Sequence, residues 1–371
     1  MNIGVLGAGQ LGRMMAIAGY PLGLDLHFFD RSAAAPAAQV ARSTAGDFGD
    51  LQALERFAVG LDLVTYEFEN VPSRTAHFLA ERVPCFLPPP GALEIAQDRY
   101  VQKCFFRELG IPTAEFEAAS ARDDLDRALG ETGVPAVLKT RRWGYDGKGQ
   151  FILQRHADSE RAWQAMDGAP LIVEALVKFE REVSLLAVRS RTGETAFYPL
   201  TENRHRDGIL RVSLAPAPGI EARMNALAQE HARKILDALN YAGVLTIEYF
   251  FLDGRLLANE MATRVHNSGH WTIEGAETSQ FENHLRAIAA MPLGSTEPRG
   301  ESAMVNLIGS VPEPESILSL PGAHLHLYGK EPRPGRKLGH VTVCSRDPRV
   351  TRESLEKLQK LAGFPRERGR L

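Results

Sequence analysis

A glycine-rich turn close to the start of the chain restricts its fold more than any other feature. Gly7, Gly9 and Gly12 form a G-x-G-x-x-G pattern directly after the apolar run NIGVLG and directly before a helical pattern. Asp30 closes the next apolar run, DLHFFD, about 20 residues further along, where the dinucleotide-binding fingerprint has its acidic residue. The pattern predicts a parallel, doubly wound sheet and makes a dehydrogenase the first candidate function.

The same alternation of short strands and helices continues over the first part of the chain. We expect buried strands at 2–7, 24–30, 43–47, 61–68 and 83–88. Helical patterns such as DLQALERFAV and SRTAHFLAERV lie between them. The stretch PPPGALEIAQDR, with three prolines and a glycine, then breaks the alternation and indicates a domain boundary. We therefore predict an N-terminal domain over residues 1–95.

The rest of the chain has a different pattern. Residues 98–131 are predicted to be mostly helical, and strands then flank the glycine-rich loop 141–150. A long amphipathic helix over 221–241 precedes a hairpin, after which short strands and turns return. We predict a central domain over 96–300 and a β-rich C-terminal region over 301–371, whose basic tail FPRERGRL should be frayed.

Composition and charge argue against several classes of function. The chain has 371 residues and a formal net charge of −3, which does not favour nucleic acid or an acidic membrane as a partner. A run of about 18 apolar residues, as in a transmembrane helix, is missing, and the first residues do not resemble a signal peptide. Cys85, Cys104 and Cys344 fit neither a disulfide framework nor a zinc motif. We expect a cytoplasmic protein with idle thiols and with no nucleic-acid or membrane partner.

A second glycine cluster, WGYDGKGQ, lies between two predicted strands. Gly144, Gly147 and Gly149 would let several backbone N–H groups point at one anion. Lys148 adds charge within the loop, and Lys139 ends the strand that leads into it. A flexible hairpin tip with a solvated lysine is the alternative, and it would be favoured if the loop had fewer glycines, lysines and aromatic residues.

The hairpin TIEYFFLDGRLLANE carries Glu248 and Glu260 on its two strands. A two-residue Asp-Gly turn would place the two carboxylates on opposite faces of the sheet, because side chains alternate along a strand. A three-residue turn at 252–254 would pair Glu248 with Ala258 and make Glu260 its diagonal neighbour on the same face. That spacing, about 7–8 Å, suits two oxygen ligands of one or two magnesium ions. Two glutamates on a solvated face are the alternative.

The segment NEMATRVHNSGHWT continues directly from that hairpin. It gathers Arg264, His266, Asn267, Ser268 and His270 within seven residues, a density of polar groups typical of a site. The two histidines lack the glutamate of a H-E-x-x-H motif, so zinc is not expected.

A last cluster, YGKEPRPGRKLGH, surrounds prolines and glycines with four cations. These are Lys330, Arg333, Arg336 and Lys337. The cluster is either a charged surface turn or a site for a substrate phosphate, which arginine and lysine both suit.

Five of these stretches, in order from residue 7 to residue 340, resemble the ATP-grasp carbon–nitrogen ligases. They are GAGQLGRM, TYEFENVP, GYDGKGQ, NEMATRVHNSGHWT and YGKEPRPGRKLGH. The resemblance implies an α/β ATP-grasp architecture: a doubly wound N-terminal domain, a central domain with a lid-bearing subdomain at about 105–178, and a C-terminal region that completes the acceptor site. In this superfamily the N-terminal glycine loop faces the acceptor and binds no NAD, so a dehydrogenase becomes the secondary candidate.

The resemblance is strongest to ligases that carboxylate aminoimidazole ribonucleotide in purine biosynthesis. It implies ATP, bicarbonate and that ribonucleotide as substrates, carboxyphosphate as the intermediate, Mg²⁺ as the metal and a homodimer as the assembly. Another ATP-grasp ligase, with a different amine acceptor, is the nearest alternative.

The resemblance also implies the roles of individual residues. ATP would be bound by Arg99, Lys139, Gly144, Tyr145, Asp146, Gly147, Lys148, Gly149, Gln150, Glu174, Ala175, Leu176, Val177, Glu182, His205, Asn259 and Glu260. Magnesium would be held by Glu248 and Glu260, and the catalytic groups would be Arg264, His266, Asn267 and Lys139. The ribonucleotide would contact Gln10, Leu11, Glu69, Asn267, Lys330, Arg336 and Lys337. The chain departs from the pattern at Ala262, where many relatives have an asparagine metal ligand, and at Thr263 and Val265, where proline is common.

Overall fold

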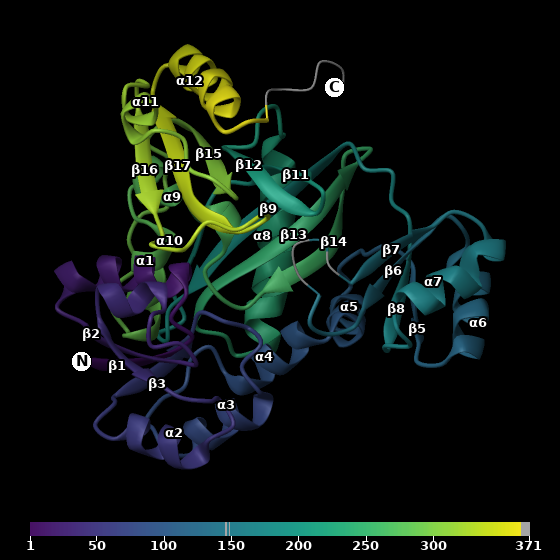
Figure 1. Ribbon diagram of the computed structural model, residues 1–371, viewed down its shortest axis with the longest axis horizontal. Helices are drawn as coiled ribbons and strands as arrows, with labels where there is room; N and C mark the ends of the chain where they lie inside the picture. Colours follow the sequence, from purple (N-terminus) through teal and green to yellow (C-terminus); the bar gives the residue numbers. More distant parts are fainter. Residues whose placement is uncertain (145–146, 148, 365–371) are drawn as a thin grey trace.

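The N-terminal residues form a parallel sheet of four strands in the order β3-β2-β1-β4. The computed structural model describes residues 1–144, 147 and 149–364 (Figure 1). The strands of this first sheet are β1 (Asn2–Leu6), β2 (Asp25–Asp30), β3 (Arg42–Ala45) and β4 (Leu63–Tyr66). Its helices are α1 (Gln10–Gly19), α2 (Leu51–Ala58) and α3 (Ser73–Ala80). The fifth strand predicted at 83–88 forms only an isolated parallel bridge, between Val64 and Phe86.

The glycine turn at the start of α1 encloses a carboxylate of the protein itself. Glu67, one residue beyond β4, accepts hydrogen bonds from the N–H of Gly9 at 2.8 Å and of Gly12 at 3.3 Å. Gly7 has a φ of +91°, and a Cβ there would lie 2.7 Å from a carboxylate oxygen of Glu67. Asp30, the acidic residue of the fingerprint, accepts from the N–H of Ala8 at 2.9 Å. Both the glycines and the aspartate therefore serve contacts within the fold.

Two helices lead from the first sheet to a small antiparallel sheet. They are α4 (Pro90–Gln97) and α5 (Arg99–Glu108). The small sheet has the order β5-β8-β6-β7, with β5 (Phe116–Ala119), β6 (Ala136–Thr140), β7 (Gln150–Leu153) and β8 (Leu171–Ala175). It is packed with α6 (Arg122–Thr132) and α7 (Ser159–Ala165), and this unit stands apart at the right of Figure 1. The prediction of mostly helical structure over 98–131 is confirmed by α5 and α6, and β5, which pairs with β8, lies between these two helices.

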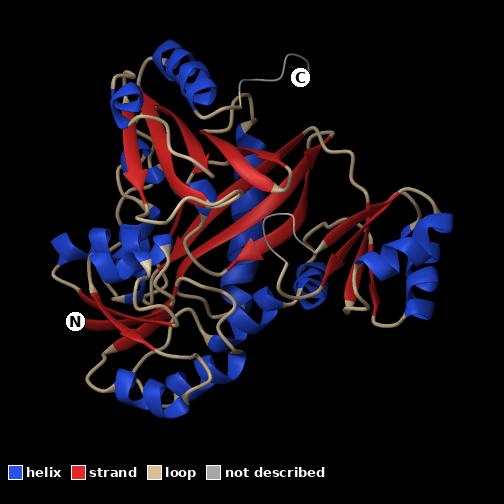
Figure 2. Ribbon diagram, in the orientation of Figure 1, coloured by secondary structure: helices blue, strands red, loops and turns tan. Residues whose placement is uncertain are grey.

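A nine-stranded sheet forms the largest part of the molecule (Figure 2). Its order is β14-β13-β9-β11-β12-β15-β17-β16, with β10 paired to β9. The strands are β9 (Arg181–Arg189), β10 (Thr195–Phe197), β11 (Thr201–Arg206), β12 (Ile209–Ala215), β13 (Gly243–Leu252), β14 (Arg255–Ala262), β15 (Glu301–Ile308), β16 (Ala323–Leu327) and β17 (Lys337–Ser345). The helices of this part are α8 (Ala222–Ala238), α9 (Thr272–Gly275), α10 (Gln280–Ile288), α11 (Pro314–Leu318) and α12 (Pro348–Leu361).

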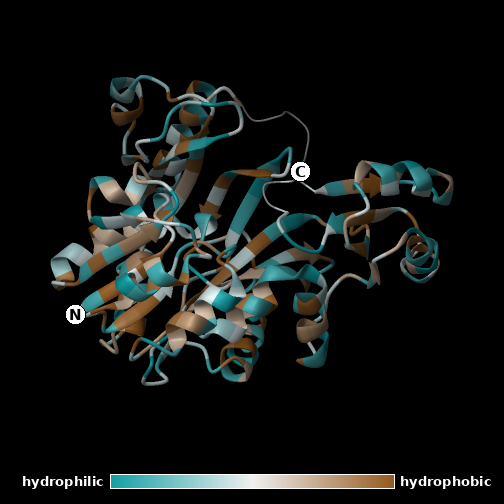
Figure 3. Cartoon of the chain, turned by 60° about the horizontal axis from the view of Figure 1, so that its bottom comes forward, coloured by the Kyte–Doolittle hydropathy of each residue, from teal (hydrophilic) through white to brown (hydrophobic). Residues whose placement is uncertain are grey.

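The first sheet and the large sheet share a hydrophobic core. Leu11 and Met15 of α1 belong to the same buried cluster as Phe281 and Leu285 of α10. Hydrophobic residues occupy many strand positions in Figure 3, whereas the helices carry both hydrophobic and hydrophilic residues. This shared core fixes the glycine turn relative to the segment that follows β14. In the described part of the chain, the helices are too short or too polar to cross a membrane.

Candidate active site

The hairpin of β13 and β14 brings Glu248 and Glu260 directly opposite each other. The predicted three-residue turn is wrong. Leu252 pairs with Arg255, and the turn consists of Asp253 and Gly254 alone, with φ values of +49° and +66°. Such a left-handed pair is the preferred two-residue hairpin turn, because its twist matches that of the strands.

A β-bulge restores the common face that this shorter turn would otherwise destroy. The register shifts between Glu248 and Tyr249, and Asn259 is the extra residue on β14. Tyr249 therefore pairs with Ala258, while Glu248 pairs with Glu260. One additional residue reverses the alternation of side chains, so the two carboxylates share a face. The predicted pairing of Glu248 with Ala258 is wrong, but the predicted common face is present.

Each of the two carboxylates has a cationic or protonatable partner. Arg99, the first residue of α5, forms an ion pair with Glu260 and also donates to the carbonyl oxygen of Gly144 at 3.2 Å. His266 Nε2 lies 3.2 Å from Glu248 Oε1. Burial alone would raise the pKa of Glu248, but the hydrogen bond and charge of His266 lower it to about 2. Burial likewise opposes ionisation of Glu260, and Arg99 keeps its pKa below the ordinary value. Both carboxylates are anions at neutral pH.

A second group of charges joins the small sheet to the bulge. Lys139 Nζ, at the end of β6, lies 3.1 Å from Glu174 Oε2 and 3.3 Å from Asn259 Oδ1. Lys103 Nζ lies 3.3 Å from the same oxygen of Glu174. Burial would raise the pKa of Glu174, but Lys103 and Lys139 together lower it to about 2.

The segment from Glu174 to Val177 begins with the last two residues of β8, an inner strand of the small sheet. The N–H of Ala175 donates to Glu115 O at 2.8 Å, and that of Leu176 donates to Pro135 O at 3.0 Å. These bonds hold the backbone where it leaves the small sheet. Further along the large sheet, Glu182 on β9 contacts His205 on β11, with Oε2 and Nδ1 separated by 2.9 Å. Burial disfavours a charged His205, but Glu182 raises its pKa above the ordinary value.

The glycine-rich loop is anchored at its first residues. Arg141 Nη2 and Arg142 Nε lie 2.8 and 3.3 Å from Asp98 Oδ2, at the N-terminus of α5. Beyond the loop, Gln150 pairs with Lys139 across β6 and β7. Of the predicted loop residues, Tyr145, Asp146 and Lys148 lie outside the described residues.

Glu69, one of the residues predicted to contact the ribonucleotide, lies against the segment that follows β14. Arg264 Nη2 lies 2.9 Å from Glu69 Oε2, and the N–H of Thr263 donates to Glu69 Oε1 at 2.8 Å. Gln10, at the start of α1, accepts from Lys330 Nζ. The TYEFENVP segment therefore meets Arg264, and the glycine turn meets the C-terminal region where Gln10 contacts Lys330.

For three other residues predicted to contact the ribonucleotide, the structure shows a position away from the contacts just described or a contact within their own loop. Leu11 is buried in the core beneath the turn. Arg336 Nη1 donates to the carbonyl oxygen of Glu331 at 3.0 Å, within its own loop. Lys337, the first residue of β17, is half-buried.

Three residues that support the site were missed by the sequence reasoning. Asn306 on β15 exchanges two amide hydrogen bonds with Asn267, at 2.8 and 3.1 Å. Gln280 accepts from the N–H of His266 at 2.8 Å and donates to its carbonyl oxygen at 2.7 Å. Lys103 is the third, and its position four residues after Arg99 on one helix was the only local signal.

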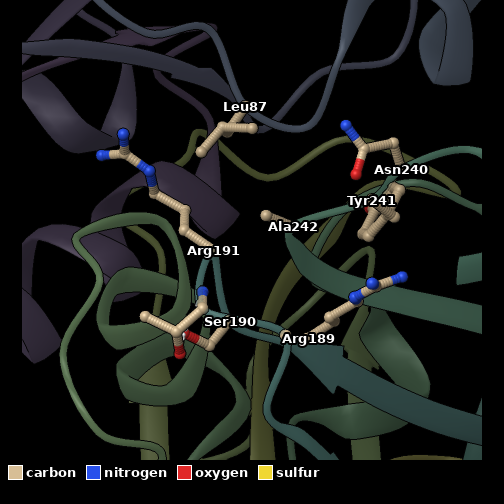
Figure 4. Close-up of a pocket in the computed structure, with 9 residues that line it drawn as sticks. Leu87, Arg189, Ser190, Arg191, Asn240, Tyr241 and Ala242 are labelled. Carbon is tan, nitrogen blue, oxygen red and sulfur yellow. Dashed lines mark hydrogen bonds between the residues drawn. The ribbon is translucent and has the colours of Figure 1, made fainter. Parts of the chain in front are cut away.

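Figure 4 shows a separate hollow of about 360 Å³. It is lined by Leu87, Arg189, Ser190, Arg191, Thr192, Gly193, Asn240, Tyr241 and Ala242. None of these belongs to the predicted site. Among the described residues, no group of three or more His, Cys, Asp or Glu side chains could hold a metal ion.

Family models match three successive parts of the chain. The Ribonucleotide synthetase preATP-grasp domain matches residues 1–97, the ATP-grasp domain matches 104–281, and the Phosphoribosylaminoimidazole carboxylase C-terminal domain matches 302–354. The chain is therefore an ATP-grasp ligase in its domain composition and fold.

Individual relatives narrow this class. The N5-carboxyaminoimidazole ribonucleotide synthase of Pseudomonas aeruginosa is 49% identical over 97% of this chain and 99% of its own. The crystal structure of the Thermus thermophilus synthetase has a TM-score of 0.95 and 55% identity, covering 98% of this chain and 100% of that one. The Aspergillus clavatus synthase, crystallised with ADP and 5-aminoimidazole ribonucleotide, has a TM-score of 0.91 and 33% identity, covering 97% and 98%. The chain belongs to the N5-carboxyaminoimidazole ribonucleotide synthase family.

Proposed function

We propose that the chain carboxylates the amine of 5-aminoimidazole ribonucleotide with ATP and bicarbonate, giving N5-carboxyaminoimidazole ribonucleotide, ADP and phosphate in purine biosynthesis. The family relationship supports this reaction. The observation that supports it most is that one continuous segment, residues 259–267, contacts both groups of predicted site residues. Asn259 and Glu260 begin this segment beside Lys139 and Arg99, and Arg264 continues it beside Glu69. A phosphate donor bound at the Asn259 end and an acceptor bound at the Arg264 end would therefore both contact this one segment.

The nucleotide would lie between the small sheet and the large one. Lys139 and Arg99 suit its phosphates, because both cations project from the ends of elements that converge on the carboxylate pair. Residues 144–150 would cover the phosphates, and the backbone at 174–177 would contact adenine. Glu182, oriented by His205, would accept from the ribose hydroxyls.

Glu248 and Glu260 would hold Mg²⁺. Two ionised carboxylates side by side on one face are an oxygen donor set that suits this ion. Magnesium takes few protein ligands when substrate phosphates and water supply the others, which agrees with Ala262 offering no ligand atom. When bound, the ion would neutralise charge on the phosphate oxygens.

The chemistry proceeds in two displacements. A bicarbonate oxygen attacks the γ-phosphorus in line, the bond to the β-phosphate oxygen breaks, and carboxyphosphate and ADP form. The acceptor amine then attacks the carboxyl carbon of carboxyphosphate and phosphate leaves, or carboxyphosphate first expels phosphate and the amine attacks the carbon dioxide formed in place. In both routes the nitrogen loses one proton, which the phosphate can accept. Arg264, His266 and Asn267 would hold the carboxyl oxygens. Closure of the glycine-rich loop would exclude water, which otherwise hydrolyses the intermediate.

The ribonucleotide would occupy the other end of the segment. Its contacts would be Gln10, Leu11, Glu69, Asn267, Lys330, Arg336 and Lys337. The hydrogen bond between Gln10 and Lys330 supports a shared site, because it joins residues 320 positions apart in the sequence.

A coupled assay of ADP release tests the function. We expect ADP formation to require ATP and Mg²⁺ and to reach its full rate only with both bicarbonate and aminoimidazole ribonucleotide. Full activity with a different amine in place of the ribonucleotide would identify another ligase of the superfamily. A nicotinamide-dependent absorbance change without ATP consumption would identify an oxidoreductase.

We also propose that the enzyme works as a cytoplasmic homodimer, on the strength of the family resemblance and the composition. Light scattering on the purified protein tests the assembly: twice the mass of one chain is expected, and a monomer at all concentrations would contradict it.

A further inference from the structure

Lys103 is a fully buried charged residue to which none of the steps above assigns a role. Its side chain extends from α5 to contacts on β8 and β14 and is 2% exposed. The ammonium donates to the carbonyl oxygen of Ala258 at 3.1 Å and lies 3.3 Å from Glu174 Oε2. A buried lysine is costly to desolvate, so these two contacts must compensate for the loss of water.

The first contact falls on the outer edge of the large sheet. Among the described residues, β14 is the outermost strand of the large sheet, and on its outer side only Thr113 makes an isolated parallel bridge, to Ala258. The N–H of Ala258 donates to Pro112 O at 2.7 Å, and its carbonyl accepts from Lys103. Gln102, the preceding residue on α5, bonds both the N–H and the carbonyl of Met261, at 2.9 and 3.1 Å. Side chains of α5 thus replace a neighbouring strand.

The spacing of these contacts depends on the bulge. Along a regular strand, residues two apart direct their backbone groups to the same edge. Ala258 and Met261 are three residues apart, yet the backbone groups of both point away from β13 and bond to α5. The spacing is three instead of two because Asn259 is an extra residue in the bulge. The contacts from α5 therefore fit the bulged form of β14 and would not fit the regular form, in which Glu260 would face away from Glu248.

The second contact of Lys103, with Glu174, compensates the charge of that buried carboxylate. Glu174 has one oxygen that is shared by Lys103 and Lys139. If ATP phosphates attract Lys139, the buried carboxylate of Glu174 keeps Lys103 as its partner. Burial lowers the pKa of Lys103 to about 8 despite the opposing effect of Glu174, so the amine is mainly protonated at neutral pH.

We propose that Lys103 is a positioning residue of the nucleotide and metal site. Its bond to the carbonyl oxygen of Ala258 stabilises the β-bulge that brings Asn259 and Glu260 into position. Its ion pair with Glu174 compensates the charge of that carboxylate while Lys139 binds the phosphates. This inference rests on the roles proposed for Lys139, Glu248 and Glu260.

The test compares three variants. Lys103→Met removes the charge and the donors with little change of shape. Lys103→Gln removes the charge but keeps a donor for the Ala258 carbonyl. Arg107→Met, one turn further along α5, removes a cation whose ion pair with Glu115 is largely exposed, and serves as the control. For each protein, binding of ADP is measured by calorimetry with and without Mg²⁺, together with kcat and both Michaelis constants and with thermal unfolding.

We expect Lys103→Met to weaken Mg²⁺-dependent ADP binding and to lower kcat/KM for ATP by about 10- to 100-fold, because a small misplacement of phosphate-binding groups has effects of that size. The Michaelis constant for the ribonucleotide should stay within about twofold of the wild-type value, since its contacts lie beyond Arg264. Lys103→Gln should be intermediate, and Arg107→Met should match the wild type.

Three results would overturn the proposal. The first is a folded Lys103→Met protein with wild-type ADP binding and kcat/KM. The second is an equal rise of both Michaelis constants, which indicates general loosening. The third is failure of both Lys103 variants to fold, which assigns Lys103 to stability alone. ADP binding does not depend on the acceptor, so this comparison remains decisive even if the wild-type protein does not carboxylate the ribonucleotide.

Discussion

The carboxylate of Glu67 occupies the N-terminus of α1, where it accepts the N–H of Gly9 at 2.8 Å. In a dinucleotide-binding protein, that position receives a pyrophosphate, because helix N-termini attract anions. Here a carboxyl group of the protein itself occupies that position: burial raises the pKa of Glu67, the N–H groups of Gly9 and Gly12 oppose that rise, and a second carboxyl group, that of Asp30, accepts the N–H of Ala8. The glycine pattern therefore indicates a close approach to an acidic group without indicating whether that group belongs to a ligand or to the protein.

This contact predicts that Glu67→Gln lowers stability. Both oxygens of Glu67 accept backbone N–H groups, whereas an amide can accept at only one of them. We expect a loss of about 1–3 kcal/mol in the free energy of unfolding, measured by chemical denaturation. Glu81→Gln, at an exposed position, is the control. Unchanged stability of the Glu67 variant would show that other contacts hold the turn.

Glu260→Gln should reduce turnover far more than it disturbs folding. The variant keeps the shape of a proposed magnesium ligand but removes its charge, and Arg99 remains in place. We expect kcat to fall by at least about 100-fold, with a higher Mg²⁺ requirement, because charge stabilisation by a bound metal contributes several kcal/mol. Glu277→Gln, which is exposed, should have no effect. Near-normal turnover of Glu260→Gln would contradict the metal role.

Hydrogen exchange should detect closure of the segment 141–150. Its first residues are fixed to Asp98 by two arginines, so nucleotide binding should protect the amides that follow them. We expect slower exchange there with an ATP analogue and Mg²⁺, and unchanged exchange in α12 as an internal reference. Equal exchange in this segment with and without nucleotide would exclude a lid.

Arg336→Ala should weaken binding of the ribonucleotide much more than binding of ATP. The residue lies in a segment stiffened by Pro332 and Pro334, and its proposed partner is the substrate phosphate. Loss of one charge-assisted contact corresponds to about 1.5–3 kcal/mol, or roughly 10- to 100-fold in the Michaelis constant for the ribonucleotide. Steady-state kinetics with each substrate varied in turn provide the measurement. A rise in the Michaelis constant for ATP alone would show that Arg336 and the cations around it belong to the nucleotide site.

Acid should destabilise the protein through Glu174. The pKa of this carboxyl is about 2 in the folded state, below the value of about 4.3 expected when unfolded. Its contribution to stability is therefore complete above about pH 4.3 and is lost as the pH falls toward 2. Glu174→Gln should show a shallower acid slope and, at neutral pH, a loss of about 3–5 kcal/mol, because two buried lysines lose their counter-charge. An unchanged acid slope in denaturation curves would contradict this assignment.

Local patterns in the sequence were sufficient for some of the elements, but they overestimated the strand at 83–88 and did not indicate β5. Apolar runs predicted β1, β2 and β4, and Asp-Gly predicted the hairpin. The register of that hairpin was wrong because the common face of Glu248 and Glu260 is produced by a bulge at Asn259, and an asparagine within a strand does not by itself indicate a bulge.

Contacts between distant elements could not be predicted in the same way. Asn306 and Gln280 reach Asn267 and His266 only because β15 and α10 pack against the segment after β14. Lys103 lies on the same helix face as Arg99, but it reaches the carbonyl oxygen of Ala258 only because α5 packs along β14, the outermost strand of the sheet. Neither condition is visible before the sheet is assembled.

The nine-stranded sheet has a consequence for how such an enzyme can be divided or recombined. β15 pairs with β12 from Val305–Val212 to Ser302–Ala215, so the ladder continues without interruption from the central strands into the C-terminal ones. Removing the chain after residue 300 would leave β12 with an unpaired edge, which invites pairing with other molecules. The C-terminal region is therefore not an exchangeable module. A new acceptor would have to be accommodated by changing side chains on a shared sheet, not by transplanting the segment that follows it.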